Sequence, residues 1–169
     1  MKKLLIVCSV LLMLLTACGS NETSQTSKES SKENMNEQIP NPWVEYSSLE
    51  EAANAIGFEF EVPEKCLNTE ITVIQGITGD LFEVIYGNEA NANEASARKG
   101  KGSSDVSGDY NTYSNEEKVT VEGIEYTVKS NDSVKLVTWV NGEYSYSLSF
   151  GDDIKVSVDE VKELVKSFK

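Results

Sequence analysis

Two stretches of the chain place apolar residues at helical spacing behind a serine start signal. Ser48 and Ser157 each stand three residues before a glutamate, which fits the capping box at a helix N-terminus. The first predicted helix stops at Gly57. The two apolar faces consist of Leu49, Ala52, Ala53 and Ile56, and of Val158, Val161, Leu164, Val165 and Phe168. Both helices are therefore predicted to be amphipathic and to cover an apolar layer.

Between these helices, β-branched and aromatic residues recur in short runs bounded by turn residues, a pattern typical of strands. The clearest turn is Asn141-Gly142, because Asn-Gly is the strongest short hairpin signal. The pattern predicts strands at residues 70–75, 81–86, 119–121, 124–128, 134–140 and 143–150. Short turns between neighbouring runs make the sheet antiparallel.

The final hairpin also predicts two unlike sheet faces. With Asn141-Gly142 as a two-residue loop, Val140 pairs with Glu143. One face then collects Val137, Trp139, Tyr144, Tyr146, Leu148 and Phe150, and the helices are expected to pack there. The other collects Val134, Leu136 and Val140 against Ser145, Ser147 and Ser149. This second face is either covered by more protein or lines a groove for an apolar ligand.

Residues 1–17 have the layout of a secretory signal. Two lysines precede an apolar stretch from Leu4 to Leu15, and small residues stand before Cys18. Twelve residues in a helix reach only about 18 Å, which is too short for a bilayer core of about 30 Å. This segment is therefore predicted to be a removable signal peptide.

Leu15-Thr16-Ala17-Cys18 resembles the lipobox of bacterial lipoproteins. The resemblance implies cleavage before Cys18 and attachment of a diacylglyceryl group to its thiol. The chain would then be lipid-anchored on the extracytoplasmic face of the cell membrane, with the membrane itself as a partner. The alternative is ordinary secretory cleavage beside a chance cysteine.

Residues 18–42 are predicted to be a tether. From Gly19 to Gln38 the only apolar residue is Met35, so the segment cannot bury enough surface to offset its ordering entropy. Ile39-Pro40-Asn41-Pro42 then stiffens the chain before the first large aromatic residue, Trp43. Residues 43–169 are of the right length for one domain with its own core.

Charge and cysteine content set further limits. The formal net charge is −13 and becomes more negative when Lys2 and Lys3 leave with the signal, which argues against nucleic-acid binding. Cys8 leaves with the signal and Cys18 is lipidated, so Cys66 remains without a disulfide partner. It is either a small buried apolar residue or a reactive thiol, and the former is favoured.

The sequence carries no recognisable catalytic or metal-binding signature. It contains no histidine, which excludes serine–histidine and cysteine–histidine catalysis and the commonest zinc sites. Pairs among Asp80, Glu83, Asp105 and Asp109 are conceivable glycosidase carboxylates, and Lys99 or Lys101 lies near Ser103 and Ser104. With 28 acidic residues such pairs arise by chance. No catalytic residue, metal or cofactor is therefore predicted.

Residues 88–113 show little regularity, which in a compact domain indicates a functional or mobile segment. Arg98 is the only arginine and stands with Lys99 and Lys101 in an acidic chain. This cluster is either an anion-docking point or an edge strand protected by lysines. Arg98, Asp109 and Tyr110 are the candidate binding residues.

Several short motifs together resemble the domain of unknown function 4367, found in lipoproteins and membrane-bound regulators of Firmicutes. They are Asn41-Pro42-Trp43, Ser48-Leu49-Glu50-Glu51-Ala52, Gly57-Phe58, Val62-Pro63, Val84-Ile85-Tyr86, Arg98-Lys99, Ser107-Gly108-Asp109-Tyr110-Asn111, Trp139 and Tyr144-Ser145-Tyr146-Ser147. The resemblance spans residues 41–168. It implies an α+β fold, a curved antiparallel sheet with two amphipathic helices packed on one face, similar to the lipoprotein-carrier group. Members of that group bind acyl chains or partner proteins in the concavity.

These observations predict a non-catalytic binding module outside the membrane. Its partner would be an apolar ligand or another envelope protein. Two alternatives stay open: a cell-wall carbohydrate hydrolase that uses paired carboxylates, and a purely structural envelope protein.

Overall fold

The computed structural model describes residues 40–169, where the chain forms a sheet of nine strands and two short helices. The strands are β1 (Val44–Glu45), β2 (Lys65–Cys66), β3 (Thr69–Ile77), β4 (Leu81–Gly87), β5 (Ala95–Lys101), β6 (Asn115–Val121), β7 (Ile124–Ser130), β8 (Val134–Asn141) and β9 (Tyr144–Phe150). The helices are α1 (Leu49–Ile56) and α2 (Val158–Leu164), the latter followed by the 3₁₀ turn η1 (Val165–Ser167). The predicted signal peptide, Cys18 and most of the predicted tether lie outside the described residues.

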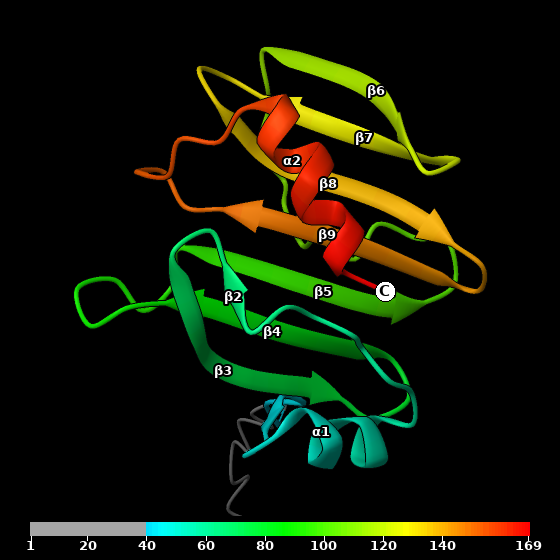
Figure 1. The fold of residues 1–169 in the computed structure, drawn as a ribbon. Helices are drawn as coiled ribbons and strands as arrows, with labels where there is room; N and C mark the ends of the chain where they lie inside the picture. The colour runs from blue at the N-terminus through cyan, green and yellow to red at the C-terminus, as the bar shows by residue number, and fades with distance from the viewer. Residues whose placement is uncertain (1–39) are drawn as a thin grey trace, which may run out of the picture. The chain divides into compact units, whose positions relative to one another are not determined.

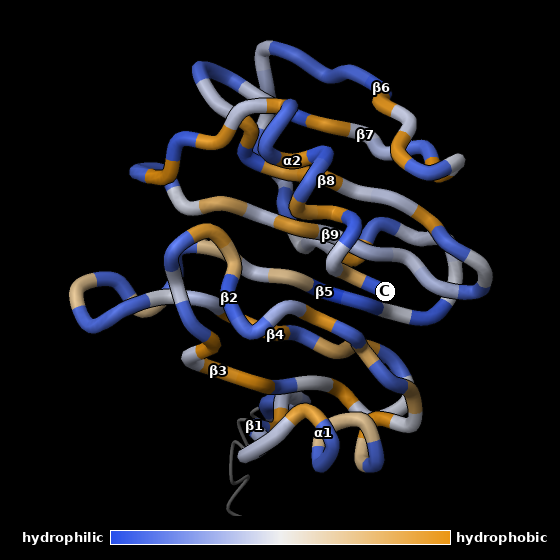
Figure 2. Tube along the Cα trace, viewed as in Figure 1, coloured by the Kyte–Doolittle hydropathy of each residue, from blue (hydrophilic) through white to orange (hydrophobic). Residues whose placement is uncertain are grey.

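Every recorded strand pair is antiparallel and the sheet is not closed, which confirms the predicted sheet type. The strand order is β1-β3-β4-β5-β9-β8-β7-β6, with β2 beside β3 (Figure 1). Strand β5 therefore joins an N-terminal group of strands to the C-terminal β6–β9 meander. At the far edge, β6 is mostly exposed and mostly hydrophilic (Figure 2), which protects it from edge-to-edge pairing.

Both helices begin at the predicted serines. The Ser48 side chain accepts a hydrogen bond from the Glu51 amide, and the Ser157 side chain accepts one from the Glu160 amide. The reciprocal bond closes the capping box at Ser157, but at α1 the Glu51 carboxylate instead accepts from the amide of Ser47. Helix α1 ends at Gly57, as predicted.

The predicted apolar face of the last hairpin lies in the main core. Val137, Trp139, Tyr146, Leu148 and Phe150 are buried, and the rings of Trp139 and Tyr146 stack with their centroids 5.0 Å apart. Helix α2 lies across β8 and β9 (Figure 1) and adds residues to the same cluster. Those residues include Val161, and η1 adds Val165.

The predicted register of this hairpin is wrong by one residue on each strand. Asn141 pairs with Tyr144, and Trp139 pairs with Tyr146 rather than Tyr144. The two-residue loop is therefore Gly142-Glu143, and Gly142 takes the positive φ of +62° that this tight turn requires. The two errors add up to a shift of two residues between the strands. Because side chains alternate with a period of two, each residue still lies on the predicted face.

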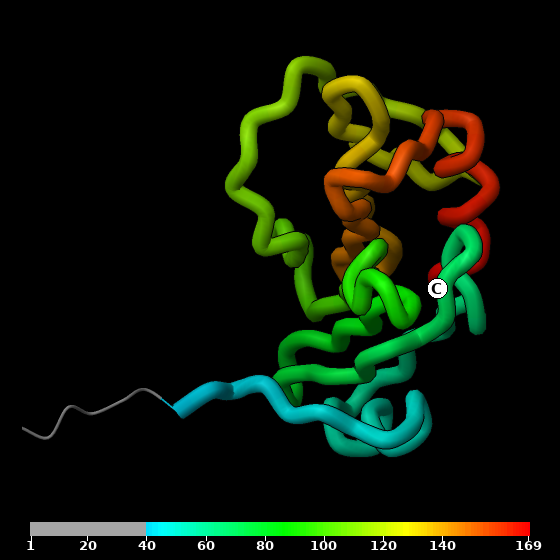
Figure 3. The backbone as a smooth tube through the Cα atoms, turned by 90° about the vertical axis from the view of Figure 1, so that its left-hand side faces the viewer, coloured from blue at the N-terminus to red at the C-terminus, as the bar shows by residue number. Residues whose placement is uncertain are grey.

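The second face of the sheet is covered in part by residues 102–114. Figure 3 shows this segment on the opposite side of the sheet from α2. Leu136 on this face is 1% exposed, and Ser147 is fully buried. Val134, predicted beside Leu136, lies instead in the main core, since the register shifts between Lys129 and Ser130.

Residues 95–101 form a strand, but the alternative of a protected edge strand is wrong. Strand β5 is central, with β4 on one side and β9 on the other. Its residues alternate, so that Ala95, Ala97 and Lys99 are buried on the core side. The two lysines and small residues gave too weak a strand signal for the sequence pattern to detect.

Candidate functional site

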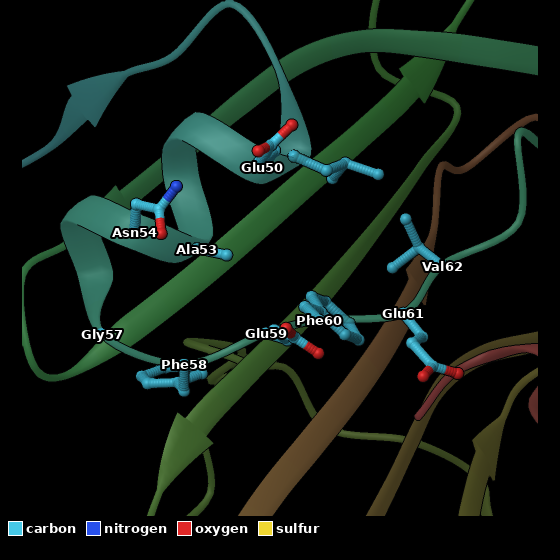
Figure 4. Close-up of a pocket in the computed structure, with 10 residues that line it drawn as sticks. Glu50, Ala53, Asn54, Gly57, Phe58, Glu59, Phe60, Glu61 and Val62 are labelled. Atoms are coloured by element: carbon cyan, nitrogen blue, oxygen red, sulfur yellow. The ribbon is translucent and has the colours of Figure 1, made fainter.

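A groove of about 760 Å³ lies between α1 and the extended segment that follows it (Figure 4). Its lining residues come from α1 and from residues 57–62. They are Leu49, Glu50, Ala53, Asn54, Gly57, Phe58, Glu59, Phe60, Glu61 and Val62. A volume of this size is typical of a preformed binding site.

The end of α1 opens this groove. Gly57 takes the left-handed conformation at φ +94°, and its amide donates to the Ala53 carbonyl over 2.8 Å. This αL cap ends the helix and reverses the chain, because glycine bears no Cβ to resist positive φ. The next five residues therefore run beside the helix rather than continuing it.

The segment Phe58–Val62 alternates apolar and acidic residues. Phe58 and Phe60 are buried, whereas Glu59 and Glu61 are exposed. The buried rings pack on core aromatics: the centroids of Phe60 and Phe82 are 5.7 Å apart. This packing anchors the segment as one wall of the groove.

The groove thus has an apolar interior and an acidic rim. Leu49, Ala53 and Val62 are partly exposed apolar residues that also pack on the core. The exposed carboxylates of Glu50, Glu59 and Glu61 line the same groove, and no ion pair to any of them is recorded among the described residues. Such a site favours an apolar partner that carries positive charge.

Lys99 holds the segment Phe58–Val62, one wall of the groove, through a hydrogen bond to its backbone. Its side chain is buried, and its Nζ atom donates to the Glu59 carbonyl over 2.7 Å and to the Lys169 carbonyl over 3.3 Å. It also lies 4.6 Å from the centre of the Tyr144 ring. Burial lowers the pKa of the Lys99 ammonium, while the carboxylates of Glu61 and Glu59 act in the opposite direction.

On the second face, Arg98 ties the covering segment to the sheet. Its Nε donates to Glu83 Oε1 over 2.7 Å, and its Nη1 donates to the Ser107 carbonyl over 2.6 Å. The guanidinium also lies 5.5 Å from the centre of the Trp43 ring. A Cβ on Gly108 would lie 2.6 Å from Nη1, so the guanidinium would have to shift, and the φ of +65° at this position also favours glycine.

The structure separates the three predicted binding residues by role. Arg98 is engaged with Glu83 and the loop, while Tyr110 is 97% exposed. Asp109 accepts hydrogen bonds from Tyr113 and from the Asn111 amide. Burial alone would raise the pKa of Asp109, but these hydrogen bonds lower it below its usual value. Arg98 and Asp109 thus shape the segment, and of the three candidates only Tyr110 is exposed to solvent.

Several acidic candidates are occupied by structural contacts. Glu83 is 3% exposed and accepts from Arg98, Ser96 and Gln75. Asp105 accepts from the Ser107 amide, which fixes the turn. Among residues 40–169 no cluster of three or more acidic, histidine or cysteine residues is arranged to hold a metal ion.

The contacts of the two candidate lysines, Lys99 and Lys101, and the burial of Cys66 indicate structural roles. The Nζ atom of Lys99 bonds to backbone carbonyls, and that of Lys101 lies 5.7 Å from the centre of the Phe58 ring. Cys66 is fully buried, and burial raises its thiol pKa to about 12. The expectation of a small buried apolar residue at Cys66 is confirmed.

The groove itself was not predicted from the sequence. The signal that locates it is the alternation Phe58-Glu59-Phe60-Glu61-Val62 directly after the helix-ending Gly57. That pattern indicates an extended segment with one buried face. Its position beside α1, however, depends on tertiary packing.

No family model matches the chain, and comparisons with curated proteins and with solved structures found no match. The resemblance to the domain of unknown function 4367 therefore stays a prediction. Within residues 40–169, no helix is both long enough and apolar enough to cross a membrane.

Proposed function

We propose that this protein is a lipid-anchored, extracytoplasmic binding module without catalytic activity, and that its partner binds in the groove beside α1. The observation that carries the proposal is the preformed groove of about 760 Å³ with its apolar interior and acidic rim. A lipid at Cys18 and the polar tether would keep the groove near the membrane while leaving it accessible. The partner is an envelope component with apolar and basic groups.

The proposal includes the finer architecture implied by the resemblance to the domain of unknown function 4367. In that architecture the sheet is curved and both helices pack on one face. Support comes from the buried cluster, to which α1 contributes Ala52 and Ile56 and α2 contributes Val161. A concave sheet would explain how two helices near opposite ends of the sheet reach one core.

Site-specific photocrosslinking in living cells tests the binding function. A benzophenone side chain at Asn54, which lines the groove, is expected to give an adduct of discrete mass. The same group at Ala55 is the matched control, because Ala55 is exposed on the same helix but is not part of the groove lining.

A second substitution links the adduct to the groove. Ala53→Arg places a long cationic side chain in the groove and is expected to abolish the adduct from position 54. Ala55→Arg should leave it intact. If position 54 gives no adduct, or one as strong as position 55, the groove is not the binding site and the proposal is wrong.

A further inference from the structure

The segment Phe58–Val62 is hydrogen-bonded like a strand, but along one edge only. The amide of Glu61 donates to the Lys169 carbonyl over 3.0 Å, and the amide of Lys169 donates back to the Glu61 carbonyl over 3.0 Å. On the same side, the Glu59 carbonyl accepts from Lys99. One edge of the segment is thus paired with the C-terminus of the chain.

The other edge is open. In an extended chain, successive residues direct their N–H and C=O groups to opposite sides. The backbone groups of Phe58, Phe60 and Val62 therefore point away from Lys169, on the side where the groove separates the segment from α1 (Figure 4). No hydrogen bond to these backbone groups is recorded from any described residue.

Unpaired backbone groups beside buried side chains are unusual. Phe60 as a whole residue is only 4% exposed, and its backbone groups face the groove without a partner in the described chain. A row of such groups at strand spacing is complementary to another extended backbone. A small apolar molecule would leave these donors and acceptors unpaired.

Resting on the binding function proposed above, we infer that the partner is an extended, cationic polypeptide segment that binds in the groove as an added β-strand. It pairs with the open edge at Phe60. Its apolar side chains lie against Leu49 and Ala53, which face the same groove. Five residues of strand extend about 17 Å, so a pentapeptide matches the five-residue edge.

The acidic rim of the groove determines the charge of the polypeptide segment that binds there. Glu50, Glu59 and Glu61 are exposed at the groove, and the chain as a whole has a formal net charge of −13. Basic residues in the segment would meet carboxylates on both walls. An acidic segment of the same apolar content would be repelled.

Binding of defined peptides tests the inference. The probe is acetyl-Lys-Leu-Lys-Leu-Lys-amide, titrated into the full-length chain held in phosphatidylcholine nanodiscs, with empty nanodiscs as the blank. Two versions carry N-methyl groups, one on residues 2 and 4 and the other on residues 1, 3 and 5. Only one set of amides faces the edge, so one version should lose at least tenfold in affinity and the other should not.

Two further comparisons locate the site and its charge preference. Ala53→Arg should weaken binding of the unmodified peptide at least tenfold, and Ala55→Arg should leave it unchanged. Acetyl-Glu-Leu-Glu-Leu-Glu-amide should bind at least tenfold more weakly than the lysine peptide.

The outcomes separate this inference from the proposed function. If the lysine peptide binds in the groove but neither N-methyl pattern matters, strand addition is wrong and the binding function stands. Strand addition is also wrong, and the binding function again stands, if no peptide binds while position 54 still crosslinks in cells. If neither peptide binding nor a crosslinked adduct is found, both are wrong.

Discussion

Arg98 has the sequence context of an anion-docking residue, but its contacts within the chain explain its presence. Its partner Glu83 is 3% exposed, and the guanidinium also reaches the covering segment through the Ser107 carbonyl. A buried carboxylate without its cation is costly. Arginine suits this position because its planar fork can bond two groups at once.

Substitution of Arg98 tests this structural role. Arg98→Met is expected to lower the free energy of unfolding by about 3 kcal/mol, because the Glu83 carboxylate would remain buried without its cation, with only Ser96 and Gln75 still donating to it. Lys101→Met removes one positive charge from the same strand without breaking a recorded ion pair, and should cost much less. Chemical denaturation measures both; equal losses would show that the buried pair has no special role.

Cys66 makes stability depend on pH. Burial raises its pKa from 9.0 to about 12, so the folded state resists loss of the thiol proton more than the unfolded state does. Its stabilising contribution is complete below pH 9 and is lost as the pH rises towards 12. Three pH units correspond to an upper bound of about 4 kcal/mol.

The matched variant for this prediction is Cys66→Ala. Between pH 9 and 12 the wild type should lose more stability than the variant in thermal unfolding. Burial lowers the pKa of Lys99, so its contribution rises with pH up to 10.5, which is the opposite sign. Burial raises the pKa of Tyr86, and the charge of Cys66 adds to the rise, so Tyr86 also loses stability at high pH and part of that loss disappears in Cys66→Ala. The Lys99 effect and the burial part of the Tyr86 effect are common to both proteins, so parallel curves would contradict the assignment to Cys66.

At the scale of elements, the sequence predicted what depends on local chemistry. The Ser48 and Ser157 caps, the end of α1 at Gly57 and most strands follow from residues close together in the chain. Strand β5 was expected only as one alternative, a protected edge strand, and its central position was missed because that position depends on its neighbours. Its pairing with β9 joins residues about 50 apart in sequence, and no local pattern reports such a pairing.

The groove likewise combines local features, which the sequence shows, with tertiary features, which it does not. The alternation in Phe58–Val62 is visible in the sequence, but its open edge and its distance from α1 are tertiary properties. The candidate residues failed to locate the groove because charge was taken as the marker. Arg98 is instead neutralised by Glu83 within the sheet.

Gly57 links helix and groove, which gives a prediction for α1. Its φ of +94° disfavours any residue with a Cβ, although no atom lies within 4 Å of that position. Gly57→Ala should therefore cost about 1 kcal/mol through backbone strain alone. Gly57→Asn should cost less, because asparagine tolerates the left-handed region. Equal costs in denaturant titrations would place the effect elsewhere.

For the whole molecule, the open edge at Phe60 and the proposed anchor act together in binding. A single pentapeptide offers few contacts, so strand addition gives modest affinity unless both partners are held at one surface. Tethering raises the effective concentration of the groove for partners on the same membrane. The proposed anchor therefore contributes to binding and does not only determine where the protein is located.

The anchor is tested by exchange of Cys18. Cys18→Ser should move the protein from the membrane fraction to the soluble or secreted fraction, because each buried CH₂ contributes about 0.8 kcal/mol and two acyl chains would be lost together. Cys66→Ala is the control: its thiol is buried in the domain, so membrane attachment should persist. Mass spectrometry of the wild type should find acylation at Cys18. If the serine variant still sediments with membranes and the wild type carries no lipid, the lipoprotein assignment fails, and the gain in effective concentration fails with it.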